Sequence, residues 1–150
     1  MKRIESFEVD HNKLEPGLYL SRQDGDVDTY DLRFKKPNLN DYLDSAATHT
    51  IEHLFATYAR NSEFADNIIY VGPMGCRTGF YLLVRDLSAE NVIKLAQKSM
   101  QFCAEFEGEI PGVSAVECGN FLEHNLILAK KYAKDYTKII KNYSPGNLKY

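Results

Sequence analysis

The predicted strands come in pairs joined by only a few residues, and these short connections constrain the fold more than any other feature. Residues 17–21 and 29–34 alternate apolar and polar side chains on either side of an acidic turn. Residues 68–71 and 80–84 form a second pair around a glycine-rich bend. Because parallel strands need a crossover of about a dozen or more residues, connections this short predict antiparallel pairing.

Three longer segments carry helical patterns. Residues 46–61 contain no glycine or proline and repeat apolar residues at helical spacing. A second helix is expected from the N-cap Ser88 to residue 106, and a third over residues 121–142. Together with the strand pairs, these helices predict an α+β fold of two layers, in which the helices pack on one face of an antiparallel sheet. A doubly wound parallel sheet is disfavoured.

Length, charge and hydropathy narrow the functional classes. The chain has 150 residues without a Pro/Gly/Ser-rich linker, so residues 1–150 are expected to form a single domain. With 18 basic and 21 acidic side chains the net charge is −3, which offers no basic field for nucleic acid. No apolar run approaches the roughly 18–20 residues of a membrane span, and no apolar segment follows the N-terminal basic residues as in a signal peptide. We therefore expect a cytoplasmic protein.

The chain has three cysteines, and in a reducing compartment a disulfide framework is improbable. Each cysteine is then a core residue, a metal ligand or a reactive thiol. Cys103 lies among apolar residues of a predicted helix, which indicates a core position. Cys76 lies beside Arg77 in a bend with three glycines and a proline, an environment that favours a reactive thiolate. A purely structural turn is the alternative for Cys76.

The strongest chemical pattern is H-x-x-E-H, formed by His49, Glu52 and His53. On a helix the two imidazoles are one turn apart and can bind one metal ion, while the carboxylate is placed for proton transfer beside it. The alternative is a helix surface with two solvated histidines. Cys118 is a candidate third ligand because it lies between a Pro-Gly turn and a predicted helix start. Burial as a small apolar residue is the alternative for Cys118.

Three further residues are ambiguous from the sequence. If the segment around Ser6 and His11 is extended, these two side chains fall on opposite faces. His11 by itself is more typical of a hydrogen-bonded surface residue than of a catalytic one. His124 follows Cys118 by six residues and is open to the same two interpretations.

Taken together, these segments resemble the S-ribosylhomocysteine lyase family, also known as LuxS or autoinducer-2 synthases. Five blocks carry the resemblance in the family's order and cover nearly the whole chain. They are Glu5-Ser6-Phe7 with Asp10-His11, Asp31-Leu32-Arg33-Phe34 with Pro37-Asn38, His49 to Leu54, Gly72 to Tyr81 around Cys76, and Cys118-Gly119 with His124. One departure is Tyr70, since many members carry an acidic residue six positions before the reactive cysteine.

The resemblance implies a divalent metal held by His49, His53 and Cys118, with water or a substrate oxygen in the fourth position. In the family this metal is ferrous iron, which zinc or cobalt replaces readily. The resemblance also implies that Ser6, His11 and Arg33 hold the substrate. Members are homodimers with two active sites at the subunit interface.

The implied reaction cleaves the thioether of S-ribosylhomocysteine to homocysteine and 4,5-dihydroxy-2,3-pentanedione, the autoinducer-2 precursor. It proceeds by two carbonyl migrations and a β-elimination, with Cys76 and Glu52 moving protons. Two other classes remain as alternatives. An inverted zinc-binding peptidase also uses H-x-x-E-H, and a metal-binding or redox-sensing domain without catalysis would use Cys76 as its sensor thiol.

Overall fold

The computed structural model describes residues 1–150. Its four strands are β1 (Gly17–Asp24), β2 (Val27–Arg33), β3 (Ile68–Pro73) and β4 (Gly79–Arg85). The helices are α1 (Ser45–Arg60), α2 (Ala89–Glu105) and α3 (Leu126–Ile140), and three short 3₁₀ turns are η1 (Glu5–Phe7), η2 (Ala65–Asn67) and η3 (Pro145–Asn147).

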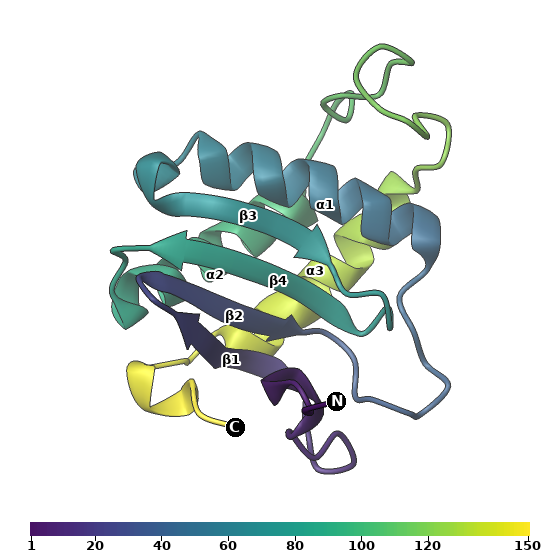
Figure 1. Cartoon of the computed structure of the whole chain (residues 1–150). Helices are drawn as coiled ribbons and strands as arrows, with labels where there is room; N and C mark the ends of the chain where they lie inside the picture. The colour runs from purple at the N-terminus through teal and green to yellow at the C-terminus, as the bar shows by residue number, and fades with distance from the viewer.

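The four strands form one antiparallel sheet in the order β1-β2-β4-β3. Figure 1 shows α2 and α3 behind this sheet and α1 running beside β3, while no helix covers the face toward the viewer. The α+β fold with helices on one face is therefore confirmed. None of the helices is both long enough and apolar enough to cross a membrane.

The face of the sheet toward the helices carries the core. Leu18, Leu32 and Phe80 have no solvent exposure and belong to a cluster of 28 buried residues that includes side chains from all three helices. Burial of each such side chain contributes about 1.5–3 kcal/mol. Alternation along the strands then places the intervening residues on the opposite, helix-free face. In one row of that face Asp31 pairs with Tyr19 on β1 and with Tyr81 on β4.

One glycine allows the two central strands to approach. A Cβ atom at Gly79 would lie 2.1 Å from the carbonyl oxygen of Leu32. Any side chain at this position would therefore push β4 away from β2. Gly79 is paired with Arg33, so the close approach also fixes where that arginine lies relative to the turn that follows β3.

One expectation about the chain is wrong, and one condition left open by the sequence is not met. The third helix begins at Leu126 rather than near residue 121, because the Asn125 side chain accepts a hydrogen bond from Leu128 N and caps the helix there. Residues 106–125 contain no helix or strand and stand away from the body of the molecule, as the green segment in Figure 1 shows. The N-terminal segment is not extended either, since Glu5–Phe7 forms a 3₁₀ turn.

Candidate metal centre and thiol site

Four possible ligands gather where α1 meets segment 106–125. His49, His53, Cys118 and His124 each offer one donor atom, and these atoms all lie within 4.8 Å of one another. Helix α1 supplies the first two because Asp44 caps its start and its apolar residues face the core, which leaves the histidines toward the segment. We call these four residues the metal cluster.

Backbone carbonyls fix the protonation of two imidazoles in the metal cluster. His49 Nδ1 lies 2.8 Å from the carbonyl oxygen of Glu123, and His53 Nδ1 lies 2.8 Å from that of Pro111. A carbonyl can only accept, so both Nδ1 atoms carry a proton, and Nε2 is the nitrogen through which each neutral imidazole could bind a metal. Outer partners of this kind are typical of metal-bound histidines.

The Cys118 sulfur completes the set with a soft donor. Its Sγ lies 3.3 Å from His49 Nε2 and accepts a hydrogen bond from the backbone N–H of Asn120. Imidazole and thiolate together suit transition metals such as zinc or iron, and not magnesium or calcium. Cys118 is not at a helix start as expected, because α3 begins only at Leu126. Its contact with the histidines comes from the fold of segment 106–125 instead.

A glycine lets segment 106–125 reach His53. Gly112 has a φ of +74°, and a Cβ atom there would lie 3.3 Å from His53 Nδ1. A side chain would be strained by the backbone conformation and would crowd the imidazole. The carbonyl of the preceding Pro111 is the acceptor for that same imidazole.

The sequence left His124 ambiguous, and the structure brings it into the metal cluster. Its Nδ1 lies 3.0 Å from the hydroxyl of Thr50, and its buried Nε2 has no hydrogen-bond partner. Burial, followed by the neighbouring His49 and His53, lowers the pKa of His124 below its usual value. His124 therefore brings an unpartnered buried nitrogen beside two imidazoles and a thiol.

Glu52 lies outside the metal cluster, on a neighbouring hollow of about 340 Å³. The hollow is lined by His49 and Glu52 of α1, by Gly75 of the turn between β3 and β4, and by Asn120 of segment 106–125. No hydrogen bond or ion pair occupies the Glu52 carboxylate. Glu52 is thus free to exchange protons with a molecule in this hollow.

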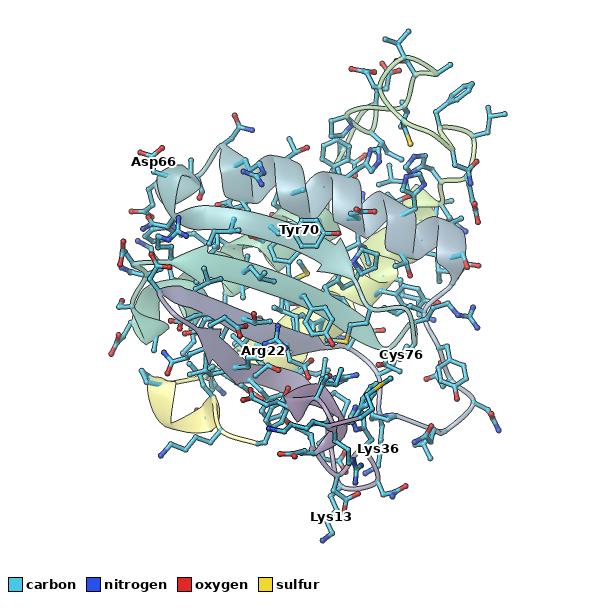
Figure 2. The ribbon with its side chains drawn as sticks, in the orientation of Figure 1. Lys13, Arg22, Lys36, Asp66, Tyr70 and Cys76 are labelled. Carbon is cyan, nitrogen blue, oxygen red and sulfur yellow. The ribbon has the colours of Figure 1, made fainter.

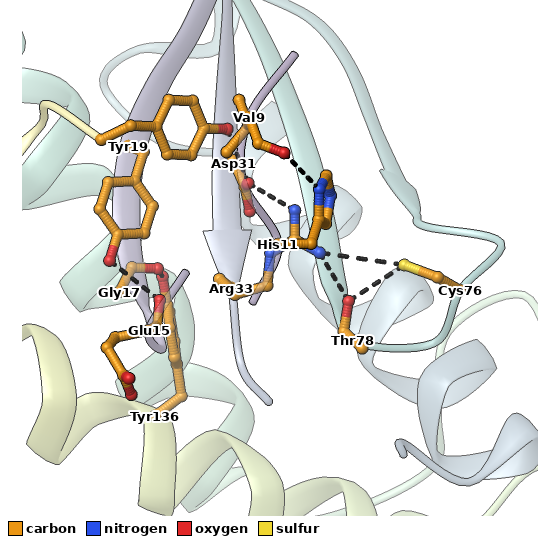
Figure 3. A network of polar contacts seen from close by, with 11 residues as sticks. Val9, His11, Glu15, Gly17, Tyr19, Asp31, Arg33, Cys76, Thr78 and Tyr136 are labelled. Carbon is orange, nitrogen blue, oxygen red and sulfur yellow. Dashed lines mark hydrogen bonds and ion pairs between the residues drawn. The ribbon is translucent and has the colours of Figure 1, made fainter. Parts of the chain in front are cut away.

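A second group of polar residues surrounds the Cys76 thiol. Cys76 Sγ lies 3.0 Å from the Thr78 hydroxyl and 3.9 Å from Nη1 of Arg33, which also donates to Thr78 Oγ1 at 2.6 Å (Figure 3). The other guanidinium nitrogen, Nη2, donates to Asp31 Oδ2 at 2.6 Å. We call these four residues the thiol network. The network thus places a guanidinium and a hydroxyl in contact with the thiol.

The thiol network contains a buried ion pair that sequence reasoning missed. The side chains of Asp31 and Arg33 are 1% and 4% exposed, and the hydroxyl of Tyr150 donates a further hydrogen bond to Asp31 Oδ2 at 2.8 Å. Burial disfavours the charged guanidinium, but the Asp31 carboxylate outweighs this effect and raises the pKa of Arg33. Burial, and then the charge of Asp31, raise the pKa of Tyr150, so its hydroxyl remains a donor. An acidic residue two positions before an arginine on a strand is the only sequence signal for this pair.

The three residues expected to hold the substrate come together beside this network. Ser6, His11 and Arg33 line one small hollow, along with Asp31 and Tyr150. The turn at Glu5–Phe7 brings Ser6 and His11 to the same hollow, which an extended chain would not do. His11 Nδ1 lies 2.8 Å from the carbonyl of Val9, as Figure 3 shows.

The remaining cysteine and Tyr70 have different surroundings. Cys103 is fully buried on α2, as expected, and burial raises the pKa of its thiol to about 12. Tyr70 lies half exposed on the helix-free face of the sheet, where it shares a hollow with Tyr81 and Leu83. No acidic side chain replaces the missing carboxylate in the lining of that hollow.

Within one chain the metal cluster and the thiol network are separate. Cys76 contacts Arg33 and Thr78, and it is not among the donors that gather around His49. Figure 2 places Cys76 at the turn between β3 and β4, away from segment 106–125. The fold and the donor set thus define a class: an α+β protein with a His/Cys cluster that could hold a transition metal, and with a separate thiol bound to an arginine and a threonine.

Comparison with known proteins narrows this class. The model of the family S-ribosylhomocysteinase (LuxS) matches residues 4–145. The chain is 50% identical to the S-ribosylhomocysteine lyase of Desulfotalea psychrophila, 46% identical to that of Finegoldia magna and 43% identical to that of Clostridium acetobutylicum. Each comparison covers 100% of this chain and 99% of the relative. The chain belongs to the S-ribosylhomocysteine lyase (LuxS) family of carbon–sulfur lyases.

Proposed function

We propose that this chain cleaves S-ribosylhomocysteine to homocysteine and 4,5-dihydroxy-2,3-pentanedione. The observation that carries the proposal is the meeting of His49, His53 and Cys118 in a chain that matches the family from residue 4 to residue 145. The whole chain, residues 1–150, serves as one catalytic domain. The relatives that carry this activity in their names are aligned over their full length.

The chemistry explains why a metal and bases are both needed. The thioether sulfur leaves carbon 5 of the ribose, and it leaves readily only when a carbonyl stands at carbon 3. The open sugar has its carbonyl at carbon 1, so two migrations precede the elimination. Each migration removes a proton from one carbon and returns one to its neighbour. The elimination then removes the carbon 4 proton, and the electron pair of the C–S bond leaves with homocysteine.

The residues of the metal cluster fit a divalent metal, and we propose ferrous iron, with zinc or cobalt as substitutes. His49, His53 and Cys118 would hold it through two imidazole nitrogens and a thiolate. When bound, such a metal supplies a Lewis acid for the oxygens of the sugar. The reaction involves no net oxidation, which agrees with the use of redox-inert zinc.

Cys76 and Glu52 are the proposed proton carriers. The Arg33 guanidinium lies 3.9 Å from the Cys76 sulfur, and this sulfur is proposed to take a proton from carbon. Glu52 borders the hollow beside His49 and is placed to move protons between the sugar oxygens. Ser6, His11 and Arg33 line the hollow beside the thiol network and are proposed to hold the substrate.

We further propose that two copies of the chain form a twofold homodimer in which each active site uses both subunits. Within one chain no hydrogen bond joins the metal cluster to the thiol network, and no helix covers the outer face of the sheet. Mixed subunits test this arrangement, because Cys76→Ala and His53→Ala are each inactive but would form one intact site per heterodimer. Recovery of activity on mixing supports shared sites, and a monomer in sedimentation at micromolar concentration refutes the dimer.

The activity is tested by incubating the metal-loaded protein with S-ribosylhomocysteine and a thiol reagent. Metal-dependent release of homocysteine supports the proposal and excludes both a peptidase and a sensor without catalysis. Cys76→Ala should abolish release while the metal remains bound. Cys103→Ala is the matched control, since this thiol is buried in the core and distant from the chemistry. No release from metal-loaded wild-type protein would overturn the proposal.

The three cysteines are free, which fits our placement of the reaction in the cytoplasm. Homocysteine would return to the activated methyl cycle, and the pentanedione would feed autoinducer synthesis for quorum sensing. The net charge of −3 agrees with a small-molecule substrate and gives no support for a nucleic-acid partner.

A further inference from the structure

The hydroxyl of Thr50 makes three contacts, and together they fix the protonation of His124. Thr50 Oγ1 lies 3.0 Å from the Ala46 carbonyl oxygen, 3.0 Å from the Asn125 backbone nitrogen and 3.0 Å from His124 Nδ1. A hydroxyl has one proton to donate and two lone pairs to accept with. The three contacts therefore use its whole capacity.

Only one assignment satisfies all three contacts. The Asn125 N–H must donate, and the Ala46 carbonyl can only accept, so it receives the Thr50 proton. The remaining lone pair of Thr50 then accepts from a proton on His124 Nδ1. The reverse assignment would leave two acceptors, Thr50 Oγ1 and the Ala46 oxygen, facing each other at 3.0 Å without a proton between them.

His124 Nε2 is consequently a bare lone pair. A proton there would create a buried cation with no acceptor, because Nε2 has no hydrogen-bond partner and is shielded from solvent. One ring nitrogen of His124 lies within 4.8 Å of the donor atoms of His49, His53 and Cys118, and Nδ1 is already bound to Thr50. An unsatisfied acceptor is thus held beside the three proposed ligands.

Ring geometry shows that His49 and His124 do not bind the same ion. The rings of His49 and His124 are stacked, with centroids 4.1 Å apart and planes inclined by 22°. The lone pair of an imidazole lies in its ring plane, so an ion bound to two imidazoles lies in both planes, and stacked planes do not meet near the rings. His53 can share an ion with His49, whose ring plane is at 90° to its own, or with His124, whose plane is at 71°. His49 is the one of these two in contact with Cys118, which assigns the ion to His49, His53 and Cys118.

We propose that His124 is a substrate-binding residue whose Nε2 accepts a hydrogen bond from a sugar hydroxyl at the metal centre, and that Thr50 positions it. The proposal deepens the proposed function and rests on it. An opened ribose carries hydroxyls that require acceptors once they are desolvated, and His124 Nε2 is the one unsatisfied buried acceptor in the metal cluster. His124 Nε2 would then be a hydrogen-bond acceptor beside the metal site, while His49, His53 and Cys118 bind the metal.

The first test does not depend on activity. In zinc-loaded, ¹⁵N-labelled protein, the proton–nitrogen couplings of histidine rings distinguish bare, protonated and metal-bound nitrogens. We expect a protonated Nδ1 and a bare Nε2 for His124, with metal-bound Nε2 for His49 and His53. In a chelator competition, the zinc affinity of His124→Phe should stay within about threefold of wild type. Loss of a metal ligand should instead lower the zinc affinity by more than the roughly 10–100-fold that is typical when a residue hydrogen-bonded to a ligand is removed. A metal-bound Nε2, or a zinc affinity that falls as far as in His49→Ala, would overturn the proposal.

The second test measures the contact with substrate. His124→Phe keeps the stacked ring but loses the acceptor, and kcat/KM for S-ribosylhomocysteine should fall about tenfold, the scale of one hydrogen bond. Thr50→Val should reproduce this loss of kcat/KM, and its nitrogen spectrum should no longer show the His124 proton fixed on Nδ1. Thr50→Ser keeps the hydroxyl and should restore both the kcat/KM and the Nδ1-protonated form. An unchanged kcat/KM in His124→Phe would refute the contact. Absence of homocysteine release from wild type would instead refute the proposed function and leave the tautomer result standing.

Discussion

The metal cluster and the thiol network are held in place by different kinds of structure. The metal cluster joins one helix to segment 106–125, which has no regular structure, and its imidazoles are oriented by carbonyls of that segment, Glu123 and Pro111. The thiol network rests on paired strands, where Asp31 and Arg33 are buried between β1 and β4. One half of the site is therefore held by a loop, and the other half is held by the sheet.

This contrast bears on how each half keeps its shape. A sheet with a full hydrogen-bond ladder and a packed core opens only with global unfolding, whereas a loop with few buried contacts opens locally. Segment 106–125 exposes Val116 and Leu122 and contributes little to the core. A bound metal would compensate, because its binding free energy adds to the stability of the folded segment. Variants that affect one half should then leave the other intact.

The largest effect is expected for His53→Ala, which removes a proposed ligand. Metal affinity should fall by more than roughly 100-fold, which is the upper end of the loss seen when a residue hydrogen-bonded to a ligand is removed. Turnover should be lost together with the metal. Amide exchange in segment 106–125 should accelerate, while exchange in β2 and β4 stays slow. Metal analysis and hydrogen exchange by mass spectrometry measure the two halves in one sample. Faster exchange in β2 as well would mean that the two halves do not behave independently.

The next effect is expected for Glu52→Gln. This change keeps the size and an oxygen acceptor but removes the capacity to take up a proton, so turnover should fall by about 10²–10⁴-fold. Metal content should stay close to wild type, because Glu52 lies outside the metal cluster. If the metal is lost instead, the carboxylate is a ligand, and the site resembles that of a peptidase more than that of a lyase.

A third prediction concerns the sheet-held half. Asp31→Asn leaves the Arg33 charge without its buried partner and should lower the free energy of unfolding by about 3–5 kcal/mol. The control is Asp24→Asn, whose exposed pair with Arg22 contributes about 1 kcal/mol or less. Urea denaturation provides the comparison, and zinc affinity should be the same in both variants. A loss no larger than in the control would mean that the network is not stabilising.

The sheet and the pairing of His49 with His53 could be predicted from the sequence because both depend on local patterns. Strand alternation, the short connections and the Ser88 cap are local signals, and the structure agrees with each of them. His49 and His53 are one helical turn apart, so their meeting follows from the helix alone. Cys118 and His124 reach them only through segment 106–125, whose path depends on long-range contacts. Family resemblance, not spacing, singled out Cys118.

The start of α3 and the buried ion pair could not be predicted from local pattern. The capping of α3 at Asn125 depends on Thr50, which is far away in the sequence and accepts the Asn125 N–H. Likewise, Asp31 appears polar in a strand and is typical of an exposed position. It is buried because Tyr150 and the N-terminal segment cover that part of the sheet. Contacts between distant segments determined both outcomes.

The smallest effect is expected for Tyr150→Phe, and it separates packing from polar support in the thiol network. The change removes the hydroxyl that donates to Asp31 Oδ2 but keeps the ring, which stacks on Tyr19 with centroids 4.8 Å apart. Asp31 Oδ1 is already without a partner, so the loss leaves Arg33 alone to satisfy the carboxylate. A hydrogen bond to a charged group contributes about 1.5–3 kcal/mol, and the free energy of unfolding should fall by the lower end of that range. Tyr143→Phe is the control, because the Tyr143 hydroxyl makes no hydrogen bond. If the two variants are equally stable, stacking alone holds Tyr150 in place, and the sheet-held half depends on fewer polar contacts than its geometry suggests.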